Sequence, residues 1–147
     1  MCSLLNRHRV RYVLAGGVAA NLHGSVRATK DVDVLVPKDR VNTERLLKAL
    51  AELPFAVSQE LNADEVFDKP VTIVGDDPRG DVLTVAWNVT FDRANRSKVV
   101  RRIAGVRVPY LGLRDLLRSK RTGRAQDLAD IEALKDIHST GKARRSP

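Results

Sequence analysis

The sequence is poor in cysteine, in aromatic residues and in long apolar runs, and each shortage excludes a class of protein. Cys2 is the only cysteine among 147 residues, which excludes an internal disulfide framework and a cysteine-rich zinc site and agrees with a reducing compartment. The longest run free of polar side chains, residues 12–20, is about half of the roughly 20 residues that a membrane-spanning helix needs. We therefore expect a cytoplasmic protein with no membrane partner.

The composition supports one folded domain. Hydrophobic residues make up 43% of the chain and charged residues 30%, which provides enough apolar material for a core and does not match a disordered chain. The length suits a single domain. We expect that domain over residues 1–140, followed by a basic, disordered tail over residues 141–147, which has no apolar anchor.

The net charge of +8 is concentrated toward the C-terminus. Residues 96–147 contain 14 Lys or Arg against 5 Asp or Glu, whereas residues 1–95 contain 12 against 13. Clustered basic residues attract polyanions such as RNA, although a basic run is as often a solvated surface. Charge alone therefore leaves both interpretations open.

The hydrophobic pattern predicts an α+β fold with a small mixed β-sheet, flanking helices and C-terminal helices. Strands are expected at residues 9–15, 31–36, 71–74, 81–89 and 106–110, and helices at residues 18–22 and 43–53. Residues 76–80 have the composition of a hairpin turn, and residues 55–69 are expected to form a loop. Two further helices are expected to carry apolar stripes, separated by a break at residues 122–123: Leu113, Leu116 and Leu117 in the first, and Leu128, Ile131, Leu134 and Ile137 in the second.

Two aspartates stand two residues apart in an otherwise apolar strand. The period of a strand places Asp31 and Asp33 on the same face, where like charges repel unless something neutralises them. Mg²⁺ prefers carboxylate oxygens and is often held by one or two carboxylates together with substrate phosphates. The alternative is that this face of an edge strand is simply exposed to water, and the pair alone does not exclude it.

A glycine pair stands where the first strand is expected to turn into a helix. Gly16 and Gly17 allow close approach to the backbone, and the N–H groups at the start of a helix can bind phosphate. Tight packing is the alternative for the glycines taken singly. The order of strand, Gly-Gly, helix and Asp-x-Asp would bring phosphate donors and metal-binding carboxylates together.

Several motifs together resemble the signature of one family. Its first part is Leu14-Ala15-Gly16-Gly17, His23-Gly24, Arg27, Thr29 and Asp31-Val32-Asp33-Val34, and its later part is Gly80-Asp81-Val82-Leu83, Lys120, Gly123-Arg124, Asp127-Leu128 and Asp130. The pattern resembles the DNA polymerase beta superfamily of nucleotidyltransferases. Within that superfamily it is most similar to small bacterial proteins that include minimal nucleotidyltransferases and nucleotidyltransferase toxins.

The resemblance implies a polymerase-beta-like fold and an activity. The expected reaction moves a nucleoside monophosphate from an NTP, such as ATP, to an acceptor hydroxyl and releases pyrophosphate. The resemblance implies that Asp31, Asp33 and Asp81 are catalytic and bind two Mg²⁺ ions, which agrees with the need of a two-metal site for carboxylates. It assigns nucleotide binding to Gly16, Gly17, Arg27, Lys30, Lys120 and Arg124. Asp127 and Asp130 are expected to order the basic residues.

Asp81 is the third carboxylate that we favour, although Asp76, Asp77 and Asp92 lie near it in sequence. It begins an apolar strand, whereas Asp76 and Asp77 occupy a turn and are expected to serve turn geometry. Asp92 lies beyond the strand.

The expected acceptor is an RNA end, such as that of a tRNA, or a protein hydroxyl, and the basic C-terminal part favours RNA. The resemblance implies the toxin of a toxin-antitoxin system with a cognate antitoxin. The alternatives are an antitoxin that modifies a HEPN-type ribonuclease partner, and a catalytically silent member that binds nucleic acid or a partner. Trp87, Phe91 and Tyr110 are expected to be mostly core residues, with stacking on a base as the alternative.

Overall fold

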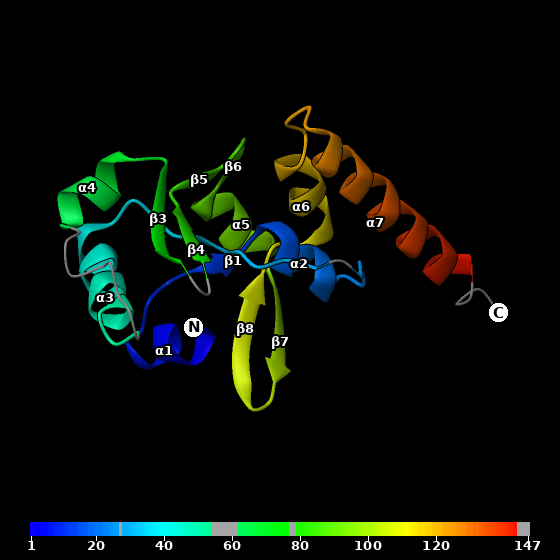
Figure 1. The fold of residues 1–147 in the computed structure, drawn as a ribbon. Helices are drawn as coiled ribbons and strands as arrows, with labels where there is room; N and C mark the ends of the chain where they lie inside the picture. The colour runs from blue at the N-terminus through cyan, green and yellow to red at the C-terminus, as the bar shows by residue number, and fades with distance from the viewer. Residues whose placement is uncertain (27, 54–61, 77–78, 144–147) are drawn as a thin grey trace.

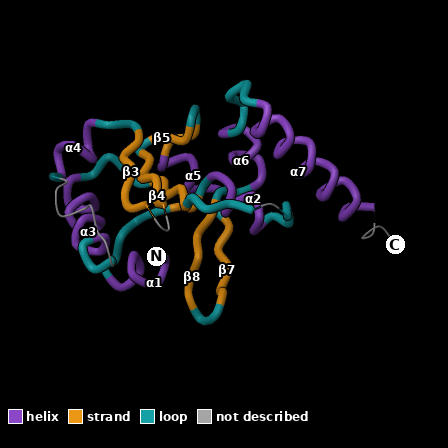
Figure 2. The backbone as a smooth tube through the Cα atoms, in the orientation of Figure 1, coloured by secondary structure: helices purple, strands orange, loops and turns teal. Residues whose placement is uncertain are grey.

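A mixed β-sheet forms the centre of the protein, with helices gathered on either side of it (Figures 1 and 2). The computed structural model describes residues 1–26, 28–53, 62–76 and 79–143. The helices are α1 (Cys2–Arg7), α2 (Gly16–Leu22), α3 (Arg40–Leu50), α4 (Ala63–Asp68), α5 (Phe91–Ser97), α6 (Leu113–Ser119) and α7 (Ala125–Ala143). The strands are β1 (Val13–Leu14), β2 (Val32–Leu35), β3 (Val71–Asp76), β4 (Arg79–Leu83), β5 (Val85–Ala86), β6 (Val89–Thr90), β7 (Val99–Ile103) and β8 (Val106–Tyr110).

The strand order confirms the predicted α+β class with a mixed sheet. The described residues form a six-stranded sheet in the order β3-β4-β2-β1-β8-β7 and a separate pair, β5 and β6. The pairs β2 with β4 and β1 with β8 are parallel, whereas β1 with β2, β3 with β4 and β7 with β8 are antiparallel. The parallel pairs place the ends of strands that are far apart in sequence at one edge of the sheet.

The register around β2 decides what lies beside the two aspartates. Asp33 is the partner of Asp81 on the parallel strand β4, and the main-chain oxygen of Asp33 accepts a hydrogen bond from the N–H of Ala15 at 2.9 Å. The face of β2 that carries Asp33 also carries Leu35, which is completely buried. That face of β2 therefore packs into the hydrophobic core at Leu35.

The strand expected at residues 9–15 is reduced to the two residues of β1. Residues 2–7 form α1, and Arg9 has a φ of 55°, so the chain becomes regular only at β1. Helix α2 begins at Gly16, two residues before the expected start, because Ala15 has the extended backbone of an N-cap residue.

Helix α3 begins earlier than expected because Asp39 caps it. The Asp39 carboxylate accepts a hydrogen bond from the N–H of Asn42 at 2.7 Å. Asn42 and Thr43, the caps expected from the sequence, lie inside the helix and are buried. Asn42 instead bonds both main-chain groups of Arg11, accepting from its N–H at 2.7 Å and donating to its oxygen at 3.1 Å.

The middle of the chain contains more elements than the pattern predicts. The hairpin of β3 and β4 is confirmed, but the expected strand over residues 81–89 ends at Leu83 and is followed by the β5-β6 pair. Helix α4 occupies part of the expected loop and buries Val66, α5 and β7 were not expected at all, and β8 is confirmed. Residues 54–61 and 77–78 lie outside the described residues.

The two C-terminal helices and the break between them are confirmed. In α7, which extends away from the sheet (Figure 1), Leu134 is completely buried, but Leu128 and Ile137 are 51% and 37% exposed. The expected four-residue stripe is thus partly wrong, because only part of α7 packs on the body. Helix α7 continues to Ala143, so it includes the first part of the expected tail. Residues 144–147 lie outside the described part, and the domain division stays a prediction.

Within the described residues, no helix combines the length and the apolar character that crossing a membrane requires.

Leu134→Ala should lower the free energy of unfolding by about 2 to 5 kcal/mol, because it removes a fully buried side chain from the contact of α7 with the core. Leu128→Ala, in the same helix but half exposed, is the matched control and should cost about 1 kcal/mol or less. Chemical denaturation measures both values. Equal losses would show that α7 does not depend on Leu134 for its attachment.

Candidate active site

A cavity of about 470 Å³ lies where β1 turns into α2, beside the first residues of β2 and β4. It is lined by Ala15, Gly16, Gly17, Thr29, Asp31, Asp33, Asp81, Leu83, Val85, Ala86, Trp87, Ser119, Lys120, Thr122, Arg124, Gln126 and Asp127. The lining joins three segments that are far apart in sequence. All three predicted carboxylates, both predicted glycines and two of the predicted basic residues share this cavity.

The surroundings of Asp33 disfavour its charged form. Burial raises the pKa of Asp33 above its ordinary value, and the charges of Asp81 and Asp31 raise it further. Lys120 and Arg124 act in the opposite direction and lower the pKa of Asp33. The cavity therefore holds negative charges that repel one another and positive charges that act on them from the connection between α6 and α7.

The donor set fits a hard cation in its chemistry. Carboxylate oxygens are the protein ligands that Mg²⁺ prefers, and Asp31, Asp33 and Asp81 supply them around one cavity. No cluster of three or more His, Cys, Asp or Glu side chains is close enough to hold a metal ion among the residues described. Mg²⁺ usually keeps waters and takes oxygens from substrate phosphates as well, so a nucleotide is the partner that would complete such a site.

Gly16 faces the carboxylate of Asp33 at a distance that leaves no room for a side chain. Its φ is 58°, and a Cβ atom there would lie 1.6 Å from Asp33 Oδ2. A Cβ atom at Gly17 would lie 2.7 Å from Thr29 Oγ1. The two glycines thus keep one wall of the cavity as bare backbone, and this close approach is what glycine permits.

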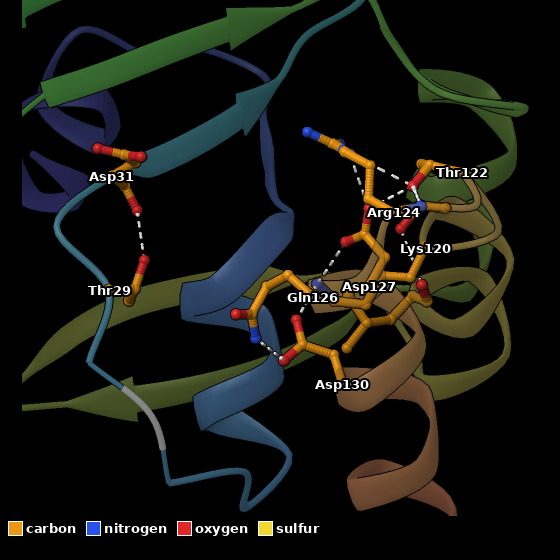
Figure 3. A network of polar contacts seen from close by, with 10 residues as sticks. Thr29, Asp31, Lys120, Thr122, Arg124, Gln126, Asp127 and Asp130 are labelled. Atoms are coloured by element: carbon orange, nitrogen blue, oxygen red, sulfur yellow. Dashed lines mark hydrogen bonds and ion pairs between the residues drawn. The ribbon is translucent and has the colours of Figure 1, made fainter.

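Thr29 links the loop before β2 to the site. Its hydroxyl donates to the main-chain oxygen of Asp31 at 3.3 Å (Figure 3). Thr29 therefore contacts the backbone at Asp31 while it also lies against Gly17.

A cluster of polar and charged side chains lies across from Thr29 and Asp31 in Figure 3, and all of its members except Asp130 line the same cavity. Lys120, which follows α6, is 5% exposed, and its ammonium group donates to Asp130 Oδ2 at 2.5 Å and to Asp127 Oδ1 at 3.4 Å. Gln126 donates to the other oxygen of Asp130 at 3.3 Å. The cluster joins α6 to α7. It agrees with the expectation that Asp127 and Asp130 hold the neighbouring basic side chains in place.

Arg124 is the exposed cation of this cluster. Its Nε donates to Asp127 Oδ2 at 3.0 Å, while its side chain is 78% exposed. The hydroxyl of Thr122 also donates to Asp127. Lys120 is thus held in place by two carboxylates, whereas most of Arg124 remains open to solvent and to a ligand.

Of the two remaining predicted residues, the structure describes only Lys30. Lys30 is exposed and does not line the cavity, and Arg27 lies outside the described residues. Among the competitors of Asp81, Asp92 lies in α5 and lines a different cavity. Asp76 is the last residue of β3, and Asp77 lies outside the described residues.

Trp87 is the residue that composition placed wrongly. Phe91 and Tyr110 are buried as expected, but Trp87 is 60% exposed and lines the cavity. Its φ of 55° is uncommon for a bulky residue. Trp87 adopts this left-handed backbone conformation because it lies in the tight turn between β5 and β6. The hydrophobic pattern of the sequence does not predict that turn.

Comparison with known proteins supports the fold. No protein-family model matches the chain, and no curated protein matches it. The crystal structure of an antigenic nucleotidyltransferase-like protein from Paracoccidioides brasiliensis superposes with a TM-score of 0.58 at 20% sequence identity, covering 90% of this chain and 71% of that chain. This protein therefore has the mixed α+β fold of a nucleotidyltransferase-like protein.

Gly16→Ala should displace the carboxylate of Asp33, because the new methyl group would overlap Oδ2, and should weaken binding of Mg²⁺ and NTP. The left-handed backbone adds a stability loss of about 1 to 2 kcal/mol. Gly105→Ala is the control, since Gly105 has a φ of 79° and nothing within 4 Å of a Cβ atom. It should lose similar stability and keep NTP binding, both measured by calorimetry. Equal NTP binding by the two variants would refute a role for the close contact.

Proposed function

We propose that the protein is a metal-dependent nucleotidyltransferase that moves a nucleoside monophosphate from an NTP to an acceptor hydroxyl and releases pyrophosphate. The observation that supports this most is the meeting of Asp31, Asp33 and Asp81 with the bare glycine wall in one cavity. A nucleotidyltransferase-like neighbour with the same fold supports it further. The acceptor in this proposal is an RNA end or a protein hydroxyl, and the toxin and antitoxin roles stay predictions.

The three aspartates would hold Mg²⁺ together with oxygens of the triphosphate. When bound, Mg²⁺ stabilises negative charge on the attacking and leaving oxygens of an in-line displacement. Burial and the charges of Asp81 and Asp31 raise the pKa of Asp33 although Lys120 and Arg124 lower it, so a bound metal cation would favour the charged form of Asp33 further. Asp33 and Asp81, neighbours across the β2-β4 pair, would present oxygens to the same place.

In the proposed reaction the acceptor oxygen forms a bond to the α-phosphorus, and the bond from that phosphorus to the bridging oxygen breaks. Asp81 would accept the proton of the acceptor hydroxyl. Gly16 and Gly17 would let the β- and γ-phosphates approach the backbone. Arg124, which is largely exposed at the cavity, would contact the phosphates, with Lys120 contributing positive charge from its fixed position.

Trp87 would stack on the base of the NTP. It is exposed, lines the same cavity as the carboxylates and presents an aromatic face that any base can use. This role suits recognition of a nucleotide without a choice among bases.

Asp33→Asn should reduce transfer about a thousandfold and should stabilise the fold at neutral pH, because it removes a charge that burial and Asp81 make unfavourable. A raised folded pKa means that the contribution of Asp33 to stability is fully present below its ordinary pKa and is lost as the pH rises through the raised value. The stability advantage of the variant should therefore grow from acid to neutral pH. Labelled NTP, Mg²⁺ and total RNA or co-expressed protein report transfer, and denaturation reports stability.

Asp92→Asn is the matched control for this substitution, because Asp92 lies in a different cavity. It should retain transfer. Full activity in Asp33→Asn, or an equal loss in Asp92→Asn, would remove the basis of the site assignment.

NTP binding should change the fluorescence of Trp87, the only tryptophan in the chain, so wild-type protein titrated with NTP reports the contact directly. Trp87→Ala should weaken NTP binding by about 1 to 3 kcal/mol, the range for base stacking on an aromatic side chain. Trp87→Phe keeps an aromatic face and should recover most of the affinity. NTP binding by calorimetry with unchanged emission and unchanged affinity in Trp87→Ala would rule the stacking role out.

A further inference from the structure

A smaller cavity, rich in basic residues, lies between β8, the end of α5, α1 and the segment that leads into β1. Its volume is about 150 Å³, and its lining contains three cationic residues and no acidic one. The lining consists of Asn6, Val10, Arg11, Tyr12, Asn95, Lys98, Arg107 and Pro109. A pocket of this size and charge suits a single anionic group such as a phosphate, which guanidinium groups bind through two parallel hydrogen bonds.

The strand register adds a fourth cation beside this cavity. Arg102 of β7 is the direct cross-strand partner of Arg107 of β8, and directly opposed residues of an antiparallel pair project from the same face. Both residues are exposed. Like charges directly opposite each other destabilise a strand pair, so an anion between them would remove an unfavourable interaction.

The contacts of these cations leave most of their charge uncompensated. Lys98 donates to the neutral oxygens of Asn95, at 2.8 Å to the main chain and 2.7 Å to the side chain. Arg102 donates to the main-chain oxygen of Gly105 at 3.4 Å. Arg11 is paired with Asp39 at 2.7 Å. Because this pair compensates the charge of Arg11, we refer to Lys98, Arg102 and Arg107 as the hairpin anion site.

Neutral side chains hold the backbone of this site in place. Asn6 of α1 donates to the main-chain oxygen of Arg107 at 2.8 Å, and its side-chain oxygen accepts from the hydroxyl of Tyr12 at 3.1 Å. Tyr12 is 4% exposed. The start of β8 is thus tied to α1 and to the core, so the hairpin presents its cations from a fixed base.

The hairpin anion site is separate from the candidate active site. Strand β8 runs parallel to β1, which leads directly into Gly16. Arg107, near the start of β8, therefore lies toward the opposite end of these strands from Gly16, and the hairpin projects from the body of the protein in Figure 1. A ligand that touches both sites must be extended.

A polynucleotide suits these observations better than an acidic protein. Phosphates recur at regular intervals along its backbone, and contacts with them position a nucleic acid without reading its sequence. A protein partner usually brings an apolar interface core, whereas the cavity lining offers only Val10 and Pro109 as aliphatic side chains.

We propose that the hairpin anion site binds the phosphodiester backbone of a polynucleotide acceptor while the end of that acceptor reacts in the first cavity. This inference rests on the proposed function for the reacting end alone, since backbone binding can be measured without transfer. Contacts that are made equally in the bound substrate and in the transition state lower the KM for that substrate and leave kcat unchanged.

The test compares Arg102→Gln combined with Arg107→Gln against a charge-matched control, Arg45→Gln combined with Lys48→Gln, whose residues are exposed on α3. The affinity for a labelled single-stranded RNA is measured by fluorescence anisotropy over a series of salt concentrations. The hairpin variant should bind at least about tenfold more weakly, and the slope of log affinity against log salt should fall by about 0.7 for each phosphate contact removed. The control should bind nearly as the wild type does.

Three outcomes would overturn the proposal: no binding of RNA by the wild type, equal losses in the two double variants, or equal affinity for poly-glutamate and RNA. The last would favour an acidic protein partner. A DNA strand of the same sequence shows whether the site distinguishes sugars or reads the shared backbone alone.

NTP binding separates this inference from the proposed function. The hairpin variant should bind NTP as the wild type does, with a raised KM for the RNA and an unchanged kcat. If the hairpin variant transfers to RNA as the wild type does, the proposed role of the hairpin anion site is wrong and the proposed transferase activity stands. If the protein neither binds nor uses NTP but its binding of RNA depends on Arg102 and Arg107, the proposed activity is wrong and the hairpin anion site stands.

Discussion

Repulsion among neighbouring carboxylates is the constraint around which the site is organised. Asp33 lies beside Asp81 through the parallel pairing of β2 and β4, and Asp31 lies immediately before the first residue of β2. Burial and these two charges raise the pKa of Asp33. These carboxylates do not serve the stability of the fold, because apolar residues at the same positions would remove the repulsion. The arrangement is intelligible when a cation and an anionic ligand complete it.

The rest of the structure accommodates this unfavourable cluster. The absence of a side chain at Gly16 leaves the space that the Asp33 carboxylate occupies. Lys120 and Arg124 come from the far end of the chain and lower the pKa that the other carboxylates raise. The ion pairs of Lys120 with Asp127 and Asp130 fix α7 to the end of α6. The packing of α7 and the electrostatics of the cavity are therefore connected, since buried charges of this kind must be paired.

The uneven distribution of charge along the sequence becomes a division of surfaces in the fold. Asp31, Asp33 and Asp81 line the first cavity, while basic residues of the C-terminal part complete it and others lie on the β7-β8 hairpin. The opposed arginines of that hairpin are a second case of like charges held together by strand register. Each site thus contains charge that a ligand of the opposite sign would neutralise. For the carboxylates of the first cavity that ligand would be a metal cation, which a triphosphate would accompany, and for the arginines of the hairpin it would be a phosphate backbone.

Local patterns in the sequence determined the features that depend on near neighbours. The alternation at residues 31–36 predicted β2, which begins at Val32, the composition of residues 76–80 predicted the hairpin that carries Asp81, and Gly16 and Gly17 marked the turn into α2. Short elements were missed, among them α4, α5 and β7, because too few residues in each show a period. The exposed edge position of β7 leaves Val99, Val100 and Ile103 partly exposed, so its burial does not alternate.

Only the tertiary structure decided which of the candidate residues meet. Register pairs Asp81 with Asp33 and Arg102 with Arg107, and a shift of one residue would have sent each to the other face. The packing of α7 against the end of α6 buries Lys120 between two carboxylates. The fold also leaves Lys30 outside the cavity lining and exposes Trp87 in the turn after β5. A sequence pattern encodes the preferences of neighbours along the chain, whereas burial and opposition depend on segments that come together only when the whole sheet has formed.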